Sequence, residues 1–255
     1  MDPHAHQTRE ASLSQPCWAC LNAIMDVSYS ATYGLLAVSR ADLLREAIQR
    51  AAPDIQGDLL RTKSLGPELR ISIAPEIVER YRPRIMEFIA FGSAVRMLGS
   101  YEAYVRDVAQ AADQADPSGM DGFRQARPGA RSRAGFNYVH PVVGRGLHLL
   151  AHVSGSRFGA DTTHEPRLMF LFELRNTNVH NCGLVTQRLI DLAHNDFVKL
   201  SRSVSIGEVL HWKPEVSAHL QLLLLDILLT ADPPVAESLS LAVETRRSWW
   251  SGWPD

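Results

Sequence analysis

The 255-residue sequence has little lysine, few cysteines and no long hydrophobic run. Only three of its 26 basic residues are lysine. The others are arginine, whose side chain suits bidentate contacts to phosphate. Three cysteines, Cys17, Cys20 and Cys182, are too few for a disulfide framework. The most apolar stretch, 220–229, is shorter than the roughly 20 residues that a membrane span needs. We therefore expect a reduced protein with no membrane-spanning segment.

Several sequence signatures are also missing. Residues 1–14 are polar and lack the apolar centre of a signal peptide, so we expect a frayed leader and a cytoplasmic location. No internal repeat is visible. The sequence contains no phosphate-binding Gly-x-x-x-x-Gly-Lys loop, no Gly-x-Ser-x-Gly elbow and no His-Glu-x-x-His motif. These absences exclude the enzyme classes that such motifs mark.

A zinc site at the N-terminus is one hypothesis that the sequence raises. His4 and His6 precede Cys17 and Cys20, and these residue types bind zinc. No second pair of ligands follows at finger-like spacing, so we expect inert thiols and predict neither a metal nor a cofactor.

The overall charge of −2 excludes a protein that is basic over its whole surface. Any contact with nucleic acid must therefore use a local patch, and the segment 118–166 is the candidate. Seven arginines between positions 122 and 167 face only two acidic residues, which gives a local balance of +5. Aromatic residues lie among them, a combination that suits a polyphosphate with unstacked bases. We predict that Arg124, Arg131 and Arg133 bind substrate; the alternative is a solvated, irregular insertion.

Apolar residues recur mostly at helical spacing, which predicts an all-α fold. Helices are expected over 17–38, 39–52, 84–114, 167–181, 184–195, 214–230 and 235–248. Alternation at 69–73 predicts a short strand or extended arm, after a loop at 53–68, and 197–206 predicts a turn or short hairpin. We expect Pro83 to break or restart a helix and the sequence Asp-Pro-Pro at 232–234 to end one. The helix at 214–230 is apolar on nearly every side, which predicts a buried central helix or an oligomer interface.

The stretch 173–183 carries the most chemistry. Arg175, Asn176 and His180 follow an apolar helical segment, and Gly183 is placed to end the helix. Histidine transfers protons near neutral pH, and arginine offsets charge on a phosphorane. Asn176 can hold substrate or imidazole by a hydrogen bond. Together these groups suit metal-independent RNA cleavage, in which the 2′-hydroxyl attacks phosphorus. The alternative is that His180 only complements the end of the helix dipole and that Arg175 forms a surface ion pair with Glu173 or a neighbour.

Helical geometry limits how this stretch can work. Asn176 and His180 are four residues apart and share one face, whereas Arg175 and His180 are five apart and lie roughly 140° apart around the axis. One rigid helix does not place the latter two side by side. A two-fold axis beside the helix would bring two arginines and two histidines into one cleft.

This stretch resembles the Arg-x4–6-His motif of HEPN domains, in which a polar residue follows the arginine. HEPN domains are helical and occur in prokaryotic toxins, abortive-infection proteins and RNA-targeting defence effectors. The sequence 100–107, Ser-Tyr-Glu-Ala-Tyr-Val-Arg-Asp, resembles the first core helix of the RiboL-PSP-like subgroup. The likeness covers roughly 85–230.

The resemblance implies a helical bundle, a homodimer with a composite site and metal-independent endoribonuclease activity against RNA. It assigns Arg175, His180 and Asn176 to catalysis, with Glu102 and Asn181 in support. The expected organisation is an N-terminal helical extension (1–80), a HEPN-like domain (81–235) carrying the basic insertion, and a C-terminal helix and tail (236–255). A toxin or phage-defence effector, with an antitoxin or other defence protein as partner, is the expected role. The alternative is a non-catalytic module that binds RNA, nucleotides or another protein.

Overall fold

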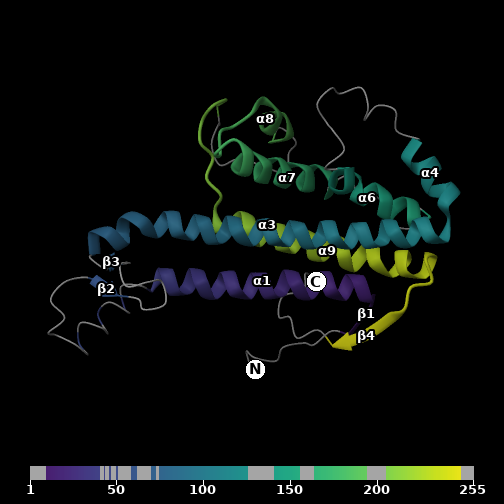
Figure 1. Ribbon diagram of the computed structural model, residues 1–255, viewed down its shortest axis with the longest axis horizontal. Coiled ribbons are helices and arrows are strands. Elements are labelled where there is room, and N and C mark those ends of the chain that lie inside the picture. The colour runs from purple at the N-terminus through teal and green to yellow at the C-terminus, as the bar shows by residue number, and fades with distance from the viewer. Residues whose placement is uncertain are drawn as a thin grey trace, which may run out of the picture.

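The computed structural model describes residues 10–40, 43, 46, 50, 59–61, 70–72, 75–125, 141–155, 164–193 and 205–247. Within this part of the chain the protein is mostly helical (Figure 1). Its helices are α1 (Gln15–Ser39), α3 (Pro75–Ala115), α4 (Pro117–Gln125), α6 (Pro141–Val153), α7 (His164–His180), α8 (Gln187–Ala193) and α9 (Pro214–Ser238). The strands are β1 (Glu10–Ser14), β2 (Leu59–Arg61), β3 (Arg70–Ser72) and β4 (Val243–Arg247). They form two antiparallel pairs, β1 with β4 and β2 with β3.

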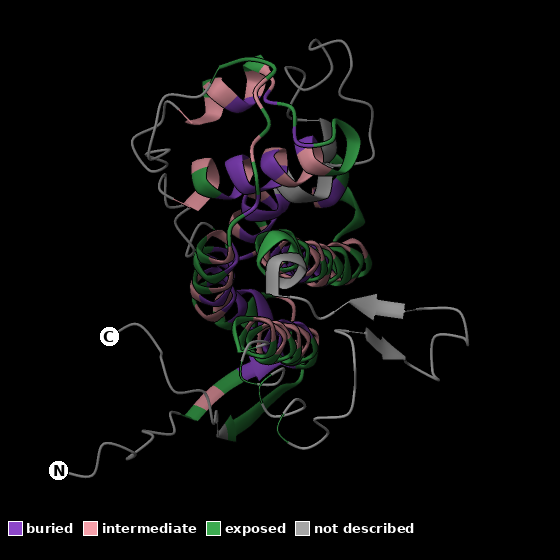
Figure 2. Cartoon of the chain, turned by 90° about the vertical axis from the view of Figure 1, so that its left-hand side faces the viewer, coloured by how far each residue is buried: buried purple, intermediate pink, exposed green. Residues whose placement is uncertain are grey.

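The helices stack in three layers. α3 and α9 lie side by side in the middle, α1 covers one side of them, and α6 and α7 cover the other (Figure 1). Figure 2 shows the buried residues turned toward these shared faces. They form one hydrophobic cluster, and its largest fully buried side chains include Trp212, Tyr101 and Tyr104. Burial of one large apolar side chain contributes about 1.5–3 kcal/mol, so this single core holds the layers together.

Helix α9 confirms the prediction of a buried central helix. Its buried face includes Leu220, Leu224, Ile227 and Leu228. By length and composition α9 is also apolar enough to cross a membrane. Its packing between two layers, with the fully buried carboxyl group of Asp232 near its end, fits the core helix of a folded domain.

The two prolines that were expected to end α9 lie inside it instead. The helix continues through Pro233 and Pro234 to Ser238. A proline inside a helix costs about 3 kcal/mol, and the residues on both sides of the pair are buried and packed. That packing offsets the cost. Pro83 likewise lies inside α3, so the predicted break at Pro83 is wrong.

Both predictions for the outer segments are wrong. Positions 10–14 are not a frayed leader but strand β1, and 243–247 are not helical but strand β4. Ser240 adopts a positive φ of 52° just after α9, which ends the helix. The two strands then pair from Glu10 with Arg247 to Ser14 with Val243. Pairing between distant segments thus overrides the local preference for helix.

The basic segment is not irregular throughout. Positions 117–125 and 141–153 are helical, and α6 enters the core through Leu147, Leu149 and Leu150. Gly146 permits this packing, because a Cβ atom there would lie 2.8 Å from the hydroxyl oxygen of Tyr101. Glycines are unfavourable in helices, and for this reason the sequence did not predict α6 as a helix.

The remaining expectations are confirmed in part. The strand expected at 69–73 is β3, but its partner β2 lies where a loop was expected. Within the expected helix at 39–52, the described residues Leu43, Glu46 and Arg50 are helical. The tryptophans at 249, 250 and 253 lie outside the described residues.

Candidate functional site

Helix α7 carries the stretch with the most chemistry, and its bounds agree with the expected helix. Its buried side is apolar and includes Leu168, Phe170 and Leu174. The same burial fixes where the polar residues lie. Arg175 and Asn176 are partly buried, whereas His180, the last residue of the helix, is exposed.

The structure brings Arg175 and Glu102 together. Nη1 of Arg175 lies 3.7 Å from Oε1 of Glu102 on α3, and both side chains are about one-fifth exposed, at 19%. The same Nη1 lies 3.5 Å from the side-chain oxygen of Asn176. Arg175 Nε and Glu102 Oε1 are both buried and without a hydrogen bond among the described residues. This pair is therefore held by charge more than by well-formed hydrogen bonds.

The alternative partner expected for Arg175 is engaged elsewhere. Glu173 pairs with Arg188 on α8, at 3.2 Å between Oε2 and Nε. The surface pair of Arg175 with Glu173 is thus wrong, and Arg175 points instead toward the middle layer of the fold.

The end of α7 is built as a tight turn. Cys182 and Gly183 both have positive φ, at 51° and 81°. The N–H of Gly183 donates to the carbonyl of Thr177 at 3.0 Å, and so does the N–H of Asn181, at 3.0 Å. This confirms that Gly183 helps to end the helix. Asn181 itself is exposed.

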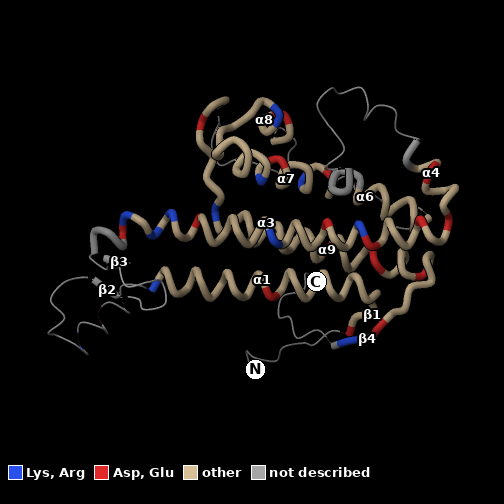
Figure 3. Tube along the Cα trace, viewed as in Figure 1, with Lys and Arg blue, Asp and Glu red and all other residues tan. Residues whose placement is uncertain are grey.

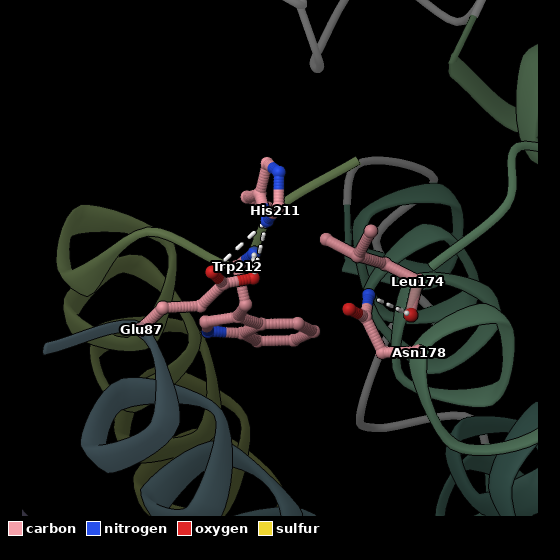
Figure 4. Close-up of polar contacts among 5 residues, drawn as sticks. All are labelled: Glu87, Leu174, Asn178, His211 and Trp212. Atoms are coloured by element: carbon pink, nitrogen blue, oxygen red, sulfur yellow. Dashed lines mark hydrogen bonds and ion pairs between the residues drawn. The ribbon is translucent and has the colours of Figure 1, made fainter. Parts of the chain in front are cut away.

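A short stretch before α9 is tied to this turn. The N–H of Leu210 donates to the carbonyl of Gly183 at 2.8 Å, and Leu184 bridges to Val209. Figure 4 shows Leu174 and Asn178 of α7 beside the Trp212 side chain, with His211 and Glu87 next to it. Asn178 donates to the carbonyl of Leu174 at 2.9 Å.

Sequence reasoning missed the pair of Glu87 and His211. Nδ1 of His211 lies 2.9 Å from each carboxylate oxygen of Glu87. The two residues are 124 positions apart, so no local spacing signals their contact. Only the packing of α3 against the segment before α9 brings them together.

The predicted substrate-binding arginines cannot be placed at this site. Arg131 and Arg133 lie outside the described residues, and Arg124 is in α4 with its side chain outside them. Along α3, in the described part, Figure 3 shows charges of both signs. The net charge of +5 is therefore a count from the sequence and is not assigned to a surface of the described residues.

The cysteines at the start of α1 behave as buried thiols. Burial is the main cause that raises the pKa of Cys17 well above its usual value, and Asp232 adds to it. Burial also raises the pKa of Cys20 to about 12. Such thiols stay protonated and are poor nucleophiles and metal ligands. His4 and His6 lie outside the described residues, and within those residues no group of three or more histidines, cysteines or acids is placed to hold a metal ion.

In comparisons with known proteins, no family model, curated protein or solved structure matches the chain. The functional conclusion therefore rests on the residues of α7 and their surroundings.

Proposed function

We propose that this protein is a metal-independent endoribonuclease of the HEPN type that acts as a toxin or phage-defence effector in the cytoplasm. The observation that carries the proposal is the arrangement on α7. One helix presents Arg175, Asn176 and His180 within its last turns, and the histidine is exposed at the helix end. Glu102 holds the arginine side chain at the base of this surface.

The proposed reaction needs no metal. The 2′-hydroxyl of RNA attacks the neighbouring phosphorus, and the P–O bond to the 5′-oxygen breaks. His180 takes part in proton transfer, Arg175 offsets the charge that develops on the phosphoryl oxygens, and Asn176 positions the substrate. The products are a 2′,3′-cyclic phosphate and a 5′-hydroxyl end. DNA lacks the attacking hydroxyl and is not a substrate.

A homodimer is part of the proposal because Arg175 and His180 point in different directions on one helix. Exposed apolar side chains lie in the last turn of α7 and in the segments that follow it: Val179, Leu184, Ile206 and Val209 are each 42–63% exposed. A second copy that covered these residues across a two-fold axis would bring both α7 ends into one cleft. RNA, a second copy of the chain and an antitoxin or defence protein are the proposed partners.

The test uses purified full-length protein, single-stranded and structured RNA, and EDTA to remove metals. Wild type is expected to cleave, and His180→Ala is expected to lower the rate at least about 100-fold. Arg175→Ala is expected to lower it by roughly 100- to 1,000-fold. His219→Ala is the matched control, because His219 is exposed on α9 and its loss should leave the rate unchanged.

Two further measurements make the test decisive. A substrate with 2′-deoxyribose at the cleaved position should resist cleavage, and sedimentation should show a dimer. Cleavage by His180→Ala at the wild-type rate would sink the enzyme proposal. A protein that stays monomeric while fully active would sink the composite site.

One observation favours a second function, a non-catalytic module that binds RNA or another protein. Arg175 is mostly buried and occupied by Glu102, as expected for a structural ion pair. This alternative expects salt-sensitive RNA binding that survives His180→Ala and weakens when Arg131 and Arg133 are replaced by alanine. Absence of RNA binding together with a stable complex with another protein would instead identify an interaction subunit.

A further inference from the structure

A second histidine is held in a fixed orientation next to the end of α7. Both carboxylate oxygens of Glu87 lie 2.9 Å from Nδ1 of His211 (Figure 4). The backbone N–H of Trp212 donates to the same carboxylate at 3.2 Å. A carboxylate only accepts hydrogen bonds, so Nδ1 carries the proton of the imidazole. The side chain of His211 is 66% exposed, and no described residue bonds to Nε2.

The backbone that carries His211 is rigid. Trp212 is fully buried, its indole N–H donates to Ser217 Oγ at 2.8 Å, and that hydroxyl donates to the carbonyl of Ala90 at 2.7 Å. The Trp212 ring also packs on Phe91, with 5.7 Å between ring centroids. These contacts tie the segment to both α3 and α9, which is how a reactive group is held in place.

The ion pair between His211 and Glu87 adds little to stability. An exposed ion pair contributes only about 0–1 kcal/mol, and Glu87 is already satisfied in part by the N–H of Trp212. A histidine with one nitrogen bound by a carboxylate and the other open to solvent is the arrangement of a proton-transfer group.

One backbone hydrogen bond links the segments that carry His211 and His180. Leu210, the preceding residue, is hydrogen-bonded to Gly183, three positions after His180. With about 3.8 Å between consecutive Cα atoms and about 5 Å across paired strands, the two histidine Cα atoms are at most roughly 20 Å apart. The compact turn after α7 shortens this path further. This limit places both histidines within the length of one short RNA strand.

We propose that His211, oriented by Glu87, is a second catalytic residue that acts on the phosphodiester of RNA. This inference rests on the proposed function. His180 accepts the proton of the 2′-hydroxyl as the bond from that oxygen to phosphorus forms. His211 gives its Nε2 proton to the 5′-oxygen as the bond from phosphorus breaks, and the Glu87 carboxylate offsets the positive charge of the protonated imidazole. One proton is taken up and one released, so the step balances.

The experiment compares two RNA oligonucleotides that differ in the leaving atom. One has the natural 5′-oxygen at the cleaved bond, and the other has a bridging 5′-sulfur, which leaves without being protonated. His211→Ala is expected to slow cleavage of the oxygen substrate at least about 100-fold and to leave the sulfur substrate within about threefold of wild type. His180→Ala should slow both substrates, because the 2′-hydroxyl must lose its proton in each.

Two more variants separate catalysis from folding. His211→Gln keeps an N–H that can donate to Glu87 and should show the same loss on the oxygen substrate alone. Glu87→Gln tests the positioning residue and should show a smaller loss with the same rescue by sulfur. His219→Ala should leave both rates unchanged.

The outcomes distinguish this inference from the proposed function. If wild type cleaves and His180→Ala does not, yet His211→Ala stays within twofold of wild type on oxygen, the assignment of His211 is overturned alone. Equal slowing of both substrates by His211→Ala overturns it as well, because a general acid is dispensable with sulfur. If wild type cleaves neither substrate, the proposed function and this assignment are overturned together.

Discussion

Asp232 connects the beginning of α1 to the end of α9. Its fully buried carboxylate accepts the backbone N–H of Ser14 at 2.7 Å, the Ser14 hydroxyl at 2.6 Å and the Tyr104 hydroxyl at 3.0 Å. Ser14 is also the N-cap of α1. An acid at this position interacts favourably with the positive end of the helix dipole, so the burial cost of the charge is offset.

Replacing Asp232 should therefore destabilise the protein strongly. Asp232→Ala leaves three buried donors without a partner, and we expect the free energy of unfolding to fall by about 3–5 kcal/mol. The control is Asp226→Ala on the same helix, which removes a half-exposed partner of His164 and should cost less than about 1 kcal/mol. Urea unfolding of both variants measures the difference; equal losses would contradict the role assigned to Asp232.

The three cysteines give a second test at this scale. Cys182 is exposed, whereas Cys17 and Cys20 are buried with raised pKa values. At pH 8 a maleimide should therefore modify only Cys182 in the folded protein, and all three thiols after unfolding. Mass spectrometry counts the adducts, and two or three adducts on folded protein would show that the start of α1 is open.

The same thiols set an alkaline limit on stability. The folded chain keeps the Cys20 proton up to a pKa of about 12, while the unfolded chain releases it near the usual value. The contribution of the buried Cys20 thiol to the free energy of unfolding is fully present below pH 9. It is lost as the pH rises toward 12, by about 1.4 kcal/mol per pH unit for one thiol. Cys20→Ala should flatten that fall, as measured by denaturation at pH 8, 9 and 10.

Among the elements, α7 depends on the turn that follows it. Gly183 has φ of 81°, and a Cβ atom there would lie 3.2 Å from the carbonyl oxygen of Leu210. Gly207 has nearly the same φ, 82°, with no atom within 4 Å of a built Cβ. The two glycines are therefore a matched pair that separates backbone strain from steric contact.

We expect Gly207→Ala to cost about 1 kcal/mol through its positive φ alone. Gly183→Ala should cost roughly 1–2 kcal/mol more, because the backbone segment that leads to His211 must also shift. The comparison is made by thermal or urea unfolding. Equal costs would mean that the contact with Leu210 is easily relieved.

The predictable elements are those whose signals are local. The apolar spacing before Arg175 and the glycine after His180 locate α7 closely. Strand β4 was not predictable, because its pairing with β1 supplies the reason for its conformation and lies more than 200 residues away. The contact between Glu87 and His211 could not be predicted for the same reason, because it joins segments far apart in the sequence. What sequence reasoning misses here is set by contacts between distant segments.

At the scale of the whole molecule, the β1–β4 pair closes the fold. Ser12 lies opposite Thr245, and their side-chain oxygens are 2.6 Å apart. Trp18 adds a hydrogen bond from its indole N–H to the Glu244 carbonyl at 2.9 Å. These contacts fix one register between the two strands.

That register predicts a specific crosslink. Cysteines introduced as Ser12→Cys and Thr245→Cys, in a Cys182→Ala background, should form a disulfide on mild oxidation. The bond should raise stability by up to about 5 kcal/mol, because it closes a very long loop. The pair Ser12→Cys with Glu244→Cys is the control and should not form it, since neighbouring side chains in a strand point to opposite faces. Thiol counting and thermal unfolding report the result; crosslinking of the control pair instead would mean a shifted register.

The contact between Ser14 and Asp232 also has a consequence in time. The two residues are 218 positions apart, and ribosomes add about 5–20 residues per second. Ser14 is therefore added to the chain roughly 10–45 seconds before Asp232, whose carboxylate binds it. During that interval Ser14 lacks its partner Asp232 and strand β1 lacks its partner β4, so the core is unfinished. The two distant segments of the core therefore meet only after Asp232 and strand β4 have been made.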